Sequence, residues 1–291
     1  GLEAALACTN RGYEVTLTEA LDKIGGRVSK ERNLPGLSAW GRVADYREYQ
    51  LSQKSNVETY LKSKLDVNQV LEFGFENVCI ATGSEWRVDG VSRQHVVPIP
   101  NDQKMPMFTP DDIMNNKIPK GKVLIYDDDH YYMGGVIAEL LIEKGCDVTL
   151  VTTSAYVSEW TKNTLEQEEI QKRLIEMGLN IKLNKGIFSI HSNFVKINCI
   201  YTQNKENLEA DAVVIVASQK PKDKLFTDLK LEKEKWKDAG IKTVKIIGDA
   251  NAPGPIAWAT YAGHRYAREL DTEIIEDALP FRREITNLKS H

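Results

Sequence analysis

An acid, two glycines and an arginine near the start of the chain have the types and spacing of a binding site. Glu19 stands at the end of a short β-branched run, "EVTL" (14–17). A carboxylate that ends the strand of a helix–strand unit can accept hydrogen bonds from the hydroxyls of a ribose. Gly25 and Gly26 allow close approach to the backbone, and Arg27 can pair with a phosphate. Each residue taken singly is better explained by a solvated strand end or an ordinary turn, but the combination favours a nucleotide site.

Two motifs later in the chain could contribute to the same site. Thr82 and Gly83 lie in "IATGS" (80–84), where a strand enters a turn of small residues. In flavoproteins with two dinucleotide-binding domains, such a turn lies at a chain crossing near the adenosine. Asp249, in "IIGDA" (246–250), precedes a helix and could hydrogen-bond a ribityl or phosphate group, or simply cap that helix. The sequence leaves both interpretations open.

The unit that positions Glu19 recurs later in the chain. The stretch "GLEAALACTNRGYEVTLTE" (1–19) aligns without gaps with "GGVIAELLIEKGCDVTLVT" (134–152). In both copies an apolar helix ends at a glycine, Gly12 or Gly145, where a positive φ angle suits the helix C-terminus. A β-branched strand follows at once. These patterns predict two equivalent helix–turn–strand units.

The strand that precedes the second copy is visible as "KVLIYDDD" (122–129), which is apolar enough to lie inside a parallel sheet. By symmetry we expect a similar strand before Gly1, outside the sequence given. Gly1 would then be the third glycine of a G-x-G-x-x-G fingerprint. In that fingerprint the glycines let the backbone approach a pyrophosphate, and the helix N-terminus faces its charge.

The second copy is a poor nucleotide site. Asp129 and Tyr131 stand where the first two glycines of the fingerprint belong, so their side chains would fill the pyrophosphate position. The carboxylates of residues 127–129 would also repel a dianion at short range. Thr152 replaces the acid that would bind the ribose. The sequence therefore predicts a unit without NAD(P) binding, and helix capping by the aspartates is compatible with this prediction.

The alternation of helices and strands predicts an α/β protein with two Rossmann-like doubly wound domains of the FAD/NAD(P)-binding type, the first without its first strand. We expect residues 1–118 and 219–291 to form a discontinuous ADP- or FAD-binding domain. Residues 119–218 would form an inserted, degenerate NAD(P)-binding-like domain.

Composition excludes several classes of protein. The chain has 291 residues and a formal net charge of −4, without the basic patch that nucleic-acid binding requires. Its apolar runs are strand-length, which predicts no membrane association. The four cysteines lie far apart without a C-x-x-C pair, so we expect no disulfide and no metal site. Buried thiols in a reducing cytoplasm are the simplest interpretation.

Six stretches together resemble the C-terminal part of trimethylamine and dimethylamine dehydrogenases. They are "ALDKIGGRV", "LPGLSAWGRVADYREYQL", "CIATGSEWR", "DDDHYYMGGVIAE", "VSEWTKNTLEQEEIQKRL" and "IIGDANAPGPIAWATYAGHRYARE". The group also includes histamine dehydrogenase, dimethylglycine and N-methylproline demethylases, and 2,4-dienoyl-CoA reductase. The resemblance covers essentially the whole chain.

The resemblance implies a larger enzyme whose N-terminal barrel holds FMN, the substrate and the cysteine ligands of a 4Fe–4S cluster. A nucleotide-binding region with ADP or FAD would follow the barrel, and electrons would pass to an electron-transferring flavoprotein. A homodimer is also implied. The present chain corresponds to the nucleotide-binding region only. We therefore expect it to contain no catalytic residue and to be inactive without the barrel.

Three functions remain as hypotheses. The degenerate second unit favours the amine dehydrogenase or demethylase branch, with ADP preferred to FAD as the bound nucleotide. A module of an NAD(P)H:flavin oxidoreductase similar to 2,4-dienoyl-CoA reductase is the first alternative. A nucleotide-free interaction module is the second.

Overall fold

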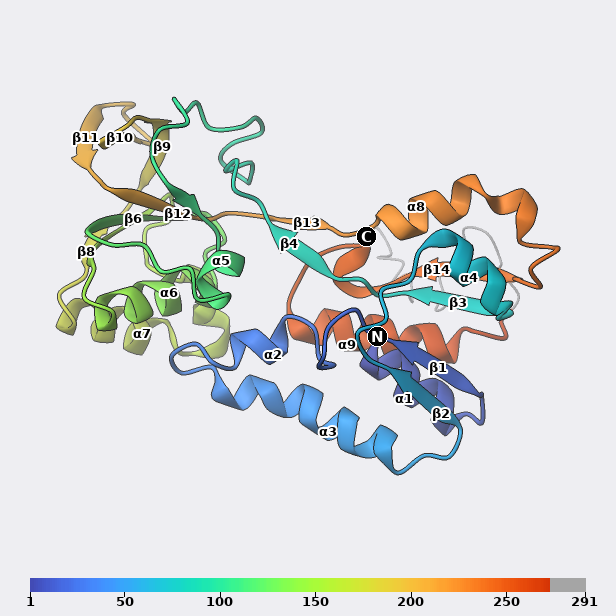
Figure 1. Ribbon diagram of the computed structural model, residues 1–291. Coiled ribbons are helices and arrows are strands. Elements are labelled where there is room, and N and C mark those ends of the chain that lie inside the picture. The colour runs from blue at the N-terminus through green and yellow to red at the C-terminus, as the bar shows by residue number, and fades with distance from the viewer. Residues whose placement is uncertain (273–291) are drawn as a thin grey trace, which may run out of the picture.

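The computed structural model describes residues 1–272 of the chain, which fold into two lobes (Figure 1). The chain leaves the first lobe along β4 (Ser84–Trp86) and returns along β13 (Gln219–Pro221). These two strands pair antiparallel and form a ribbon between the lobes. The final part of the expected domain 219–291, residues 273–291, lies outside the described residues.

The first lobe consists of the two ends of the described chain. Its strands are β1 (Val15–Thr18), β2 (Val57–Tyr60), β3 (Asn77–Ile80) and β14 (Thr243–Ile246). Its helices are α1 (Leu2–Asn10), α2 (Val28–Glu31), α3 (Arg42–Ser52), α4 (Val67–Phe73), α8 (Lys224–Leu231) and α9 (Ile256–Arg268), with 3₁₀ turns η1 (Ser38–Gly41), η3 (Lys233–Lys235) and η4 (Gly248–Ala250). Helices α1 and α9 pack so closely that a Cβ on Gly263 would lie 2.9 Å from the backbone nitrogen of Ala4.

The second lobe is built on a five-stranded parallel sheet of order β5-β12-β6-β7-β8. Its strands are β5 (Met107–Phe108), β6 (Lys122–Asp127), β7 (Asp147–Thr152), β8 (Asn180–Lys182) and β12 (Ala212–Val216). An antiparallel sheet adds β9 (Lys185–Ile190), β10 (Phe194–Cys199) and β11 (Lys205–Glu209), and the helical elements are α5 (Pro110–Met114), α6 (Tyr132–Glu143), α7 (Gln167–Glu176) and η2 (Glu159–Thr164).

The core of the second lobe lies on both faces of strands β6 and β12. Every residue of β12, and every residue of β6 after Lys122, is buried. Continuous burial of this kind explains why both strands read as unbroken apolar runs instead of alternating patterns. One face belongs to a core with α6, and the other packs against the antiparallel sheet.

Most of the local elements predicted from sequence are confirmed. The two repeated units form α1 followed by β1 and α6 followed by β7. Gly12 and Gly145 follow these helices with φ angles of +89° and +82°. No helix within residues 1–272 is long and apolar enough to cross a membrane.

The expectation of two doubly wound, Rossmann-like domains is wrong. Among the described residues, only the second lobe contains a larger parallel sheet, whereas β1 pairs only with β2 and β3 only with β14. A repeat of helix and strand fixes local units, but a doubly wound sheet also needs neighbouring strands, and tertiary contacts decide which strands pair. Residues before 119 also belong to the second lobe, because β5 joins its sheet.

Candidate functional site

The residues singled out in the first lobe gather mainly where β3 and β14 end. These strands are parallel, so their C-terminal ends share one edge. Thr82 and Gly83 follow β3, and Asp249 follows β14. A Cβ on Gly1 would lie 3.6 Å from the Cβ of Ala81, which places the start of α1 at the same point. We call this region the first edge.

Arg27 reaches the first edge and is held there by three partners. Its Nε lies 2.8 Å from Oδ2 of Asp249, and its Nη1 lies 2.9 Å from Oε1 of Glu31. Its Nη2 donates to the carbonyl of Gly254. A guanidinium has five N–H donors, so two remain for a ligand. Arg27 is thus a pre-positioned cation, although the two carboxylates neutralise much of its charge.

Glu31 is a further candidate site residue, which the sequence motifs did not indicate. Its side chain is fully buried, and its Oε2 has no hydrogen-bond partner among residues 1–272. Burial raises the pKa of Glu31, and the charge of Arg27 opposes that shift. The only signal in the sequence is the i,i+4 spacing from Arg27, which is common on exposed helices and therefore not informative.

Glu19 lies at the end of β1, beside a groove of about 360 Å³ whose lining includes Thr18, Tyr60 and Lys62. Its Oε1 accepts the backbone N–H of Leu21 at 2.9 Å. Within residues 1–272, no hydrogen bond or ion pair joins Glu19 to Arg27 or Asp249. The acid and the arginine that the sequence predicts to act together are therefore not in direct polar contact in the described part of the chain.

The glycines and Thr82 occupy turns that suit their residue types. Gly25 and Gly26 have φ angles of +112° and +58°, and Gly83 has +77°, which are backbone conformations that favour glycine. The hydroxyl of Thr82 donates to the carbonyl of Lys222, and the Lys222 N–H donates to the carbonyl of Gly83 at 2.9 Å. This segment therefore lies where the chain returns from the second lobe.

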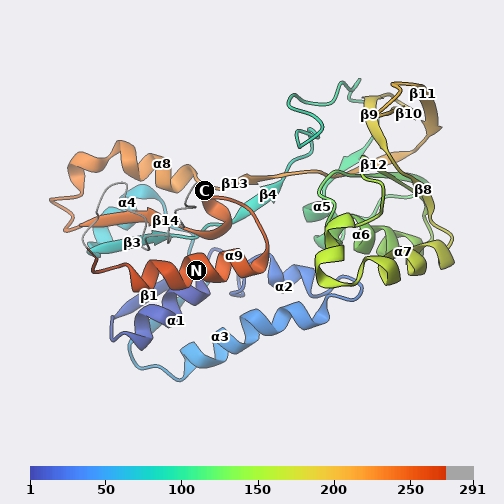
Figure 2. The same cartoon turned by 180° about the vertical axis from the view of Figure 1, so that it is seen from behind.

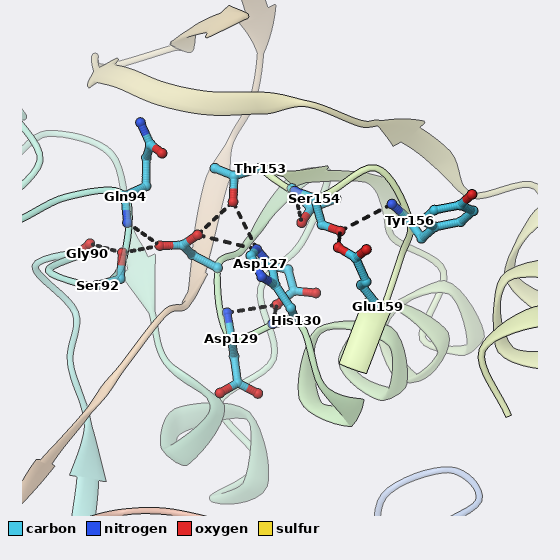
Figure 3. Close-up of polar contacts among 12 residues, drawn as sticks. Gly90, Ser92, Gln94, Asp127, Asp129, His130, Thr153, Ser154, Tyr156 and Glu159 are labelled. Carbon is cyan, nitrogen blue, oxygen red and sulfur yellow. Dashed lines mark hydrogen bonds and ion pairs between the residues drawn. The ribbon is translucent and has the colours of Figure 1, made fainter. Parts of the chain in front are cut away.

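The corresponding region of the second lobe, the loop 127–131 after β6, is filled by its own side chains (Figure 3). We call it the second edge. Oδ1 of Asp127 accepts the backbone N–H groups of Asp129 and His130 at 3.2 and 2.9 Å. Within the described residues its Oδ2 has no hydrogen-bond partner, and burial, with the charge of Asp129, raises the pKa of Asp127 to about 7.

The next carboxylate, Asp128, is satisfied from several sides. It accepts the backbone N–H of Gln94 at 2.9 Å, the Thr153 hydroxyl at 2.7 Å and the hydroxyl of Ser92. Burial acts to raise the pKa of Asp128, but these bonds and His130 lower it to about 2. Because the Thr153 hydroxyl donates to Asp128, it must accept from Nε2 of His130, which lies 2.9 Å away.

The second edge leaves no room for a ligand at the start of α6. A Cβ on Gly134 would lie 2.5 Å from Cγ of Asp127, so the carboxylate occupies the space that this glycine opens. The carbonyl of His130, whose φ angle is +64°, accepts the N–H of Trp160 at 2.9 Å. The ring of Tyr131 packs against that of Tyr132 with centroids 4.5 Å apart. In the described part of the chain, no group of three or more His, Cys, Asp or Glu residues could hold a metal ion.

Comparisons with known proteins give a consistent result. Residues 108–218 match the family model "OYE-like second alpha/beta domain", which replaces the expected inserted Rossmann-like fold. Dimethylamine dehydrogenase of Hyphomicrobium sp. (strain x) is 33% identical over 98% of this chain and 42% of its own length.

Solved structures agree with this match. Histamine dehydrogenase from Rhizobium sp. 4-9 superimposes with a TM-score of 0.97 and 59% identity, over 99% of this chain and 45% of that chain. The 6-hydroxypseudooxynicotine amine oxidase from Pseudomonas geniculata N1 gives 0.89 and 41%, over 93% of this chain and 40% of that chain.

The chain is therefore homologous to amine dehydrogenases, which are oxidoreductases. It spans less than half the length of these relatives. The resemblance to dimethylamine and histamine dehydrogenases inferred from the sequence motifs is confirmed.

Proposed function

We propose that this chain is the nucleotide-holding part of a flavin-dependent amine dehydrogenase, with ADP or FAD bound in the first lobe. The observation that carries the proposal is the 59% identity to histamine dehydrogenase over 99% of this chain. The whole enzyme would contain FMN and a 4Fe–4S cluster in an N-terminal barrel outside this chain. An electron-transferring flavoprotein as acceptor, a homodimer and a cytoplasmic location belong to the same proposal.

The residues of the first lobe fit an adenine nucleotide. Glu19 would accept hydrogen bonds from the ribose beside the groove at the end of β1. Gly1, Gly25 and Gly26 would let the backbone approach the diphosphate, while Arg27 would offer its two remaining donors. Thr82, Gly83 and Asp249 would border the nucleotide at the first edge. When bound, ADP would serve as a structural anion, whereas FAD would add a redox centre.

The alternative of an NAD(P)H:flavin oxidoreductase module receives no support from the second edge. A pyridine dinucleotide would bring a pyrophosphate to the start of α6, where the Asp127 carboxylate already lies beside Gly134. Displacing a fully buried carboxylate that accepts two backbone N–H groups would be costly. The third hypothesis, a nucleotide-free interaction module, has no particular observation in its favour.

The proposal is tested on the full-length gene product. The purified protein is denatured, and the released cofactors are separated by chromatography and identified by mass. We expect one adenine nucleotide and one FMN for each chain. In the native protein, histamine or dimethylamine should reduce the flavin, whereas NADPH should not. Absence of an adenine nucleotide, or rapid reduction by NADPH, would contradict the proposal.

A further inference from the structure

Residues 27–41 run from the first edge to the core of the second lobe, and we call this segment the strap. It contains α2 and η1 and includes the sequence "LPGLSAW" (34–40). By chain order it belongs to the first lobe, because it connects β1 to α3.

The strap is fastened to the first lobe by its N-terminal residue. Arg27 pairs with Asp249 at 2.8 Å and donates to the carbonyl of Gly254, both of which lie between β14 and α9. Within the strap, Glu31 pairs with Arg27 at 2.9 Å and is fully buried. The ionic end of the strap is therefore fixed to the first edge.

The rest of the strap belongs to the core of the second lobe. Leu34 and Leu37 are 6% and 3% exposed and are members of the same apolar core as Ile125 and Ile137 of the second lobe. The ring of Trp40 meets that of Tyr132 edge-on, with centroids 5.1 Å apart. Because two leucines are buried and a partly buried tryptophan packs beside them, this is a core contact and not a surface contact.

A polar contact adds to this attachment. The Nζ of Lys30 donates to Oδ1 of Asn115, directly after α5, at 2.8 Å. The strap thus touches the second lobe both at its α5 side and at the N-terminus of α6.

The strap and the β4–β13 ribbon join the lobes at opposite sides of the junction (Figure 2). The ribbon alone consists of two adjacent strands, Gln219 facing Trp86 and Pro221 facing Ser84, and would act as a hinge with one axis. The strap attaches the lobes at a point away from that axis and therefore prevents rotation of one lobe relative to the other about the ribbon. We propose that the strap locks the two lobes into one rigid unit, so that the second lobe neither rotates nor opens independently.

The first test compares amide hydrogen exchange within the wild-type full-length protein. The amides of Leu34, Leu37 and Trp40 donate to backbone carbonyls within the strap. If the strap is part of the second-lobe core, they should exchange within tenfold of the rate of the β6 amides, after correction for intrinsic rates. Exchange more than tenfold faster than in β6 would overturn the proposal.

The second test removes the apolar attachment. In the double variant Leu37→Ala/Trp40→Ala, the backbone amides of both α6 and the β4–β13 ribbon should exchange at least tenfold faster. Without the strap, any motion between the lobes would act on the ribbon. The matched control Leu231→Ala/Trp258→Ala removes the same side-chain types from positions that are 80% and 66% exposed, and should change these rates less than twofold. If the exchange rates in α6 or the ribbon rise less than tenfold in the Leu37/Trp40 variant, the proposal that the strap locks the lobes is wrong. The wild-type comparison decides the matter if that variant does not fold.

Discussion

The two edges start from similar helix–strand units and end with opposite contents. At the first edge, glycines with positive φ angles and a partly exposed Arg27 leave hydrogen-bond donors unused. At the second edge, Asp127 turns back and accepts the N–H groups of the loop itself. Under the proposed function the first arrangement receives an anionic ligand, whereas in the second a carboxyl side chain fills the corresponding space.

This difference shows how a binding edge can be closed without a change of local fold. A helix N-terminus offers N–H groups and a positive partial charge, which attract an anion from solution or from the chain. In the second lobe the carboxyl group of Asp127 takes these N–H groups, and Gly134 supplies the space for it.

The largest effect should come from Gly134→Ala. The new Cβ would lie 2.5 Å from Cγ of the buried Asp127, and overpacking of this kind costs on the order of 3 kcal/mol. The adjacent Gly135→Ala is the control, because its nearest neighbour would be the Ser158 hydroxyl at 3.1 Å, and we expect a change within about 1 kcal/mol. The measurement is the opening free energy of the β6 amides by native-state hydrogen exchange. The cost of Gly134→Ala should shrink in an Asp127→Ala background, and an unchanged cost would show that the carboxylate is not the obstacle.

Glu19→Ala should weaken nucleotide binding at the first lobe. Loss of hydrogen bonds to a charged group costs roughly 1.5–3 kcal/mol, which corresponds to roughly a 10- to 100-fold increase in the Kd for ADP. Calorimetric titration of ADP into nucleotide-free full-length protein measures this change. As the control, replacement of the exposed Glu14 by alanine should leave the Kd for ADP within about twofold of the wild-type value. Equal affinities for the Glu19 variant and the wild type would remove Glu19 from the site.

Asp127→Asn should change the pH dependence of the second lobe. The folded protein raises the pKa of Asp127 to about 7, above the ordinary carboxyl value near 4. The native state therefore binds more protons between these values, so the free energy of unfolding falls as pH rises from about 4 to about 7. Asparagine cannot ionise, so the variant should gain on the order of 1–2 kcal/mol relative to wild type between pH 5.5 and pH 7.

The readout for this pH prediction is the urea concentration at which the β6 amides lose protection, determined at both pH values. Asp45→Asn is the control, since Asp45 is exposed and its hydrogen-bonded ion pair with Arg32 lowers its pKa instead of raising it. A parallel pH dependence in wild type and the Asp127 variant would contradict the assignment.

The smallest effect should come from Arg93→Ala at the second edge. The guanidinium of Arg93 lies over the ring of Trp160 at 5.2 Å from its centroid. An exposed cation–π contact contributes about 0.5–1 kcal/mol, so we expect a loss of that size in the opening free energy of the β6 amides. Lys172→Ala, which removes an exposed ion pair with Glu169, should cost less than about 0.5 kcal/mol. Equal effects of the two variants would mean that Arg93 does not help to hold the loop.

Local elements were predictable because their determinants are close in sequence. Gly12 and Gly145 mark the ends of helices, and the apolar runs of β6 and β12 report strands covered on both faces. The obstruction at the second edge was also anticipated, from Asp129 and Tyr131. The residue that fills the space beside Gly134 is instead Asp127.

The prediction of two doubly wound domains failed because strand pairing depends on residues that are far apart in the sequence. Helix–strand repeats constrain which segments form strands, but not which strands become neighbours. In the first lobe β3 pairs with β14, which lies more than 160 residues further along the chain. The pairing of Arg27 with Asp249 also joins residues that are remote in the sequence. None of these contacts leaves a periodic signal in the sequence.

The secondary structure of the repeated units, the turns that need glycine and the relationship to amine dehydrogenases all follow from the amino-acid sequence. These properties depend on backbone sterics, apolar periodicity and motifs that can be read residue by residue. The folded structure was needed to show that carboxylates hold Arg27, that Glu19 lies beside a groove at the end of β1 and that the strap enters the second-lobe core. Such contacts depend on which buried groups meet in space, because burial and charge act over a few ångströms and not along the chain.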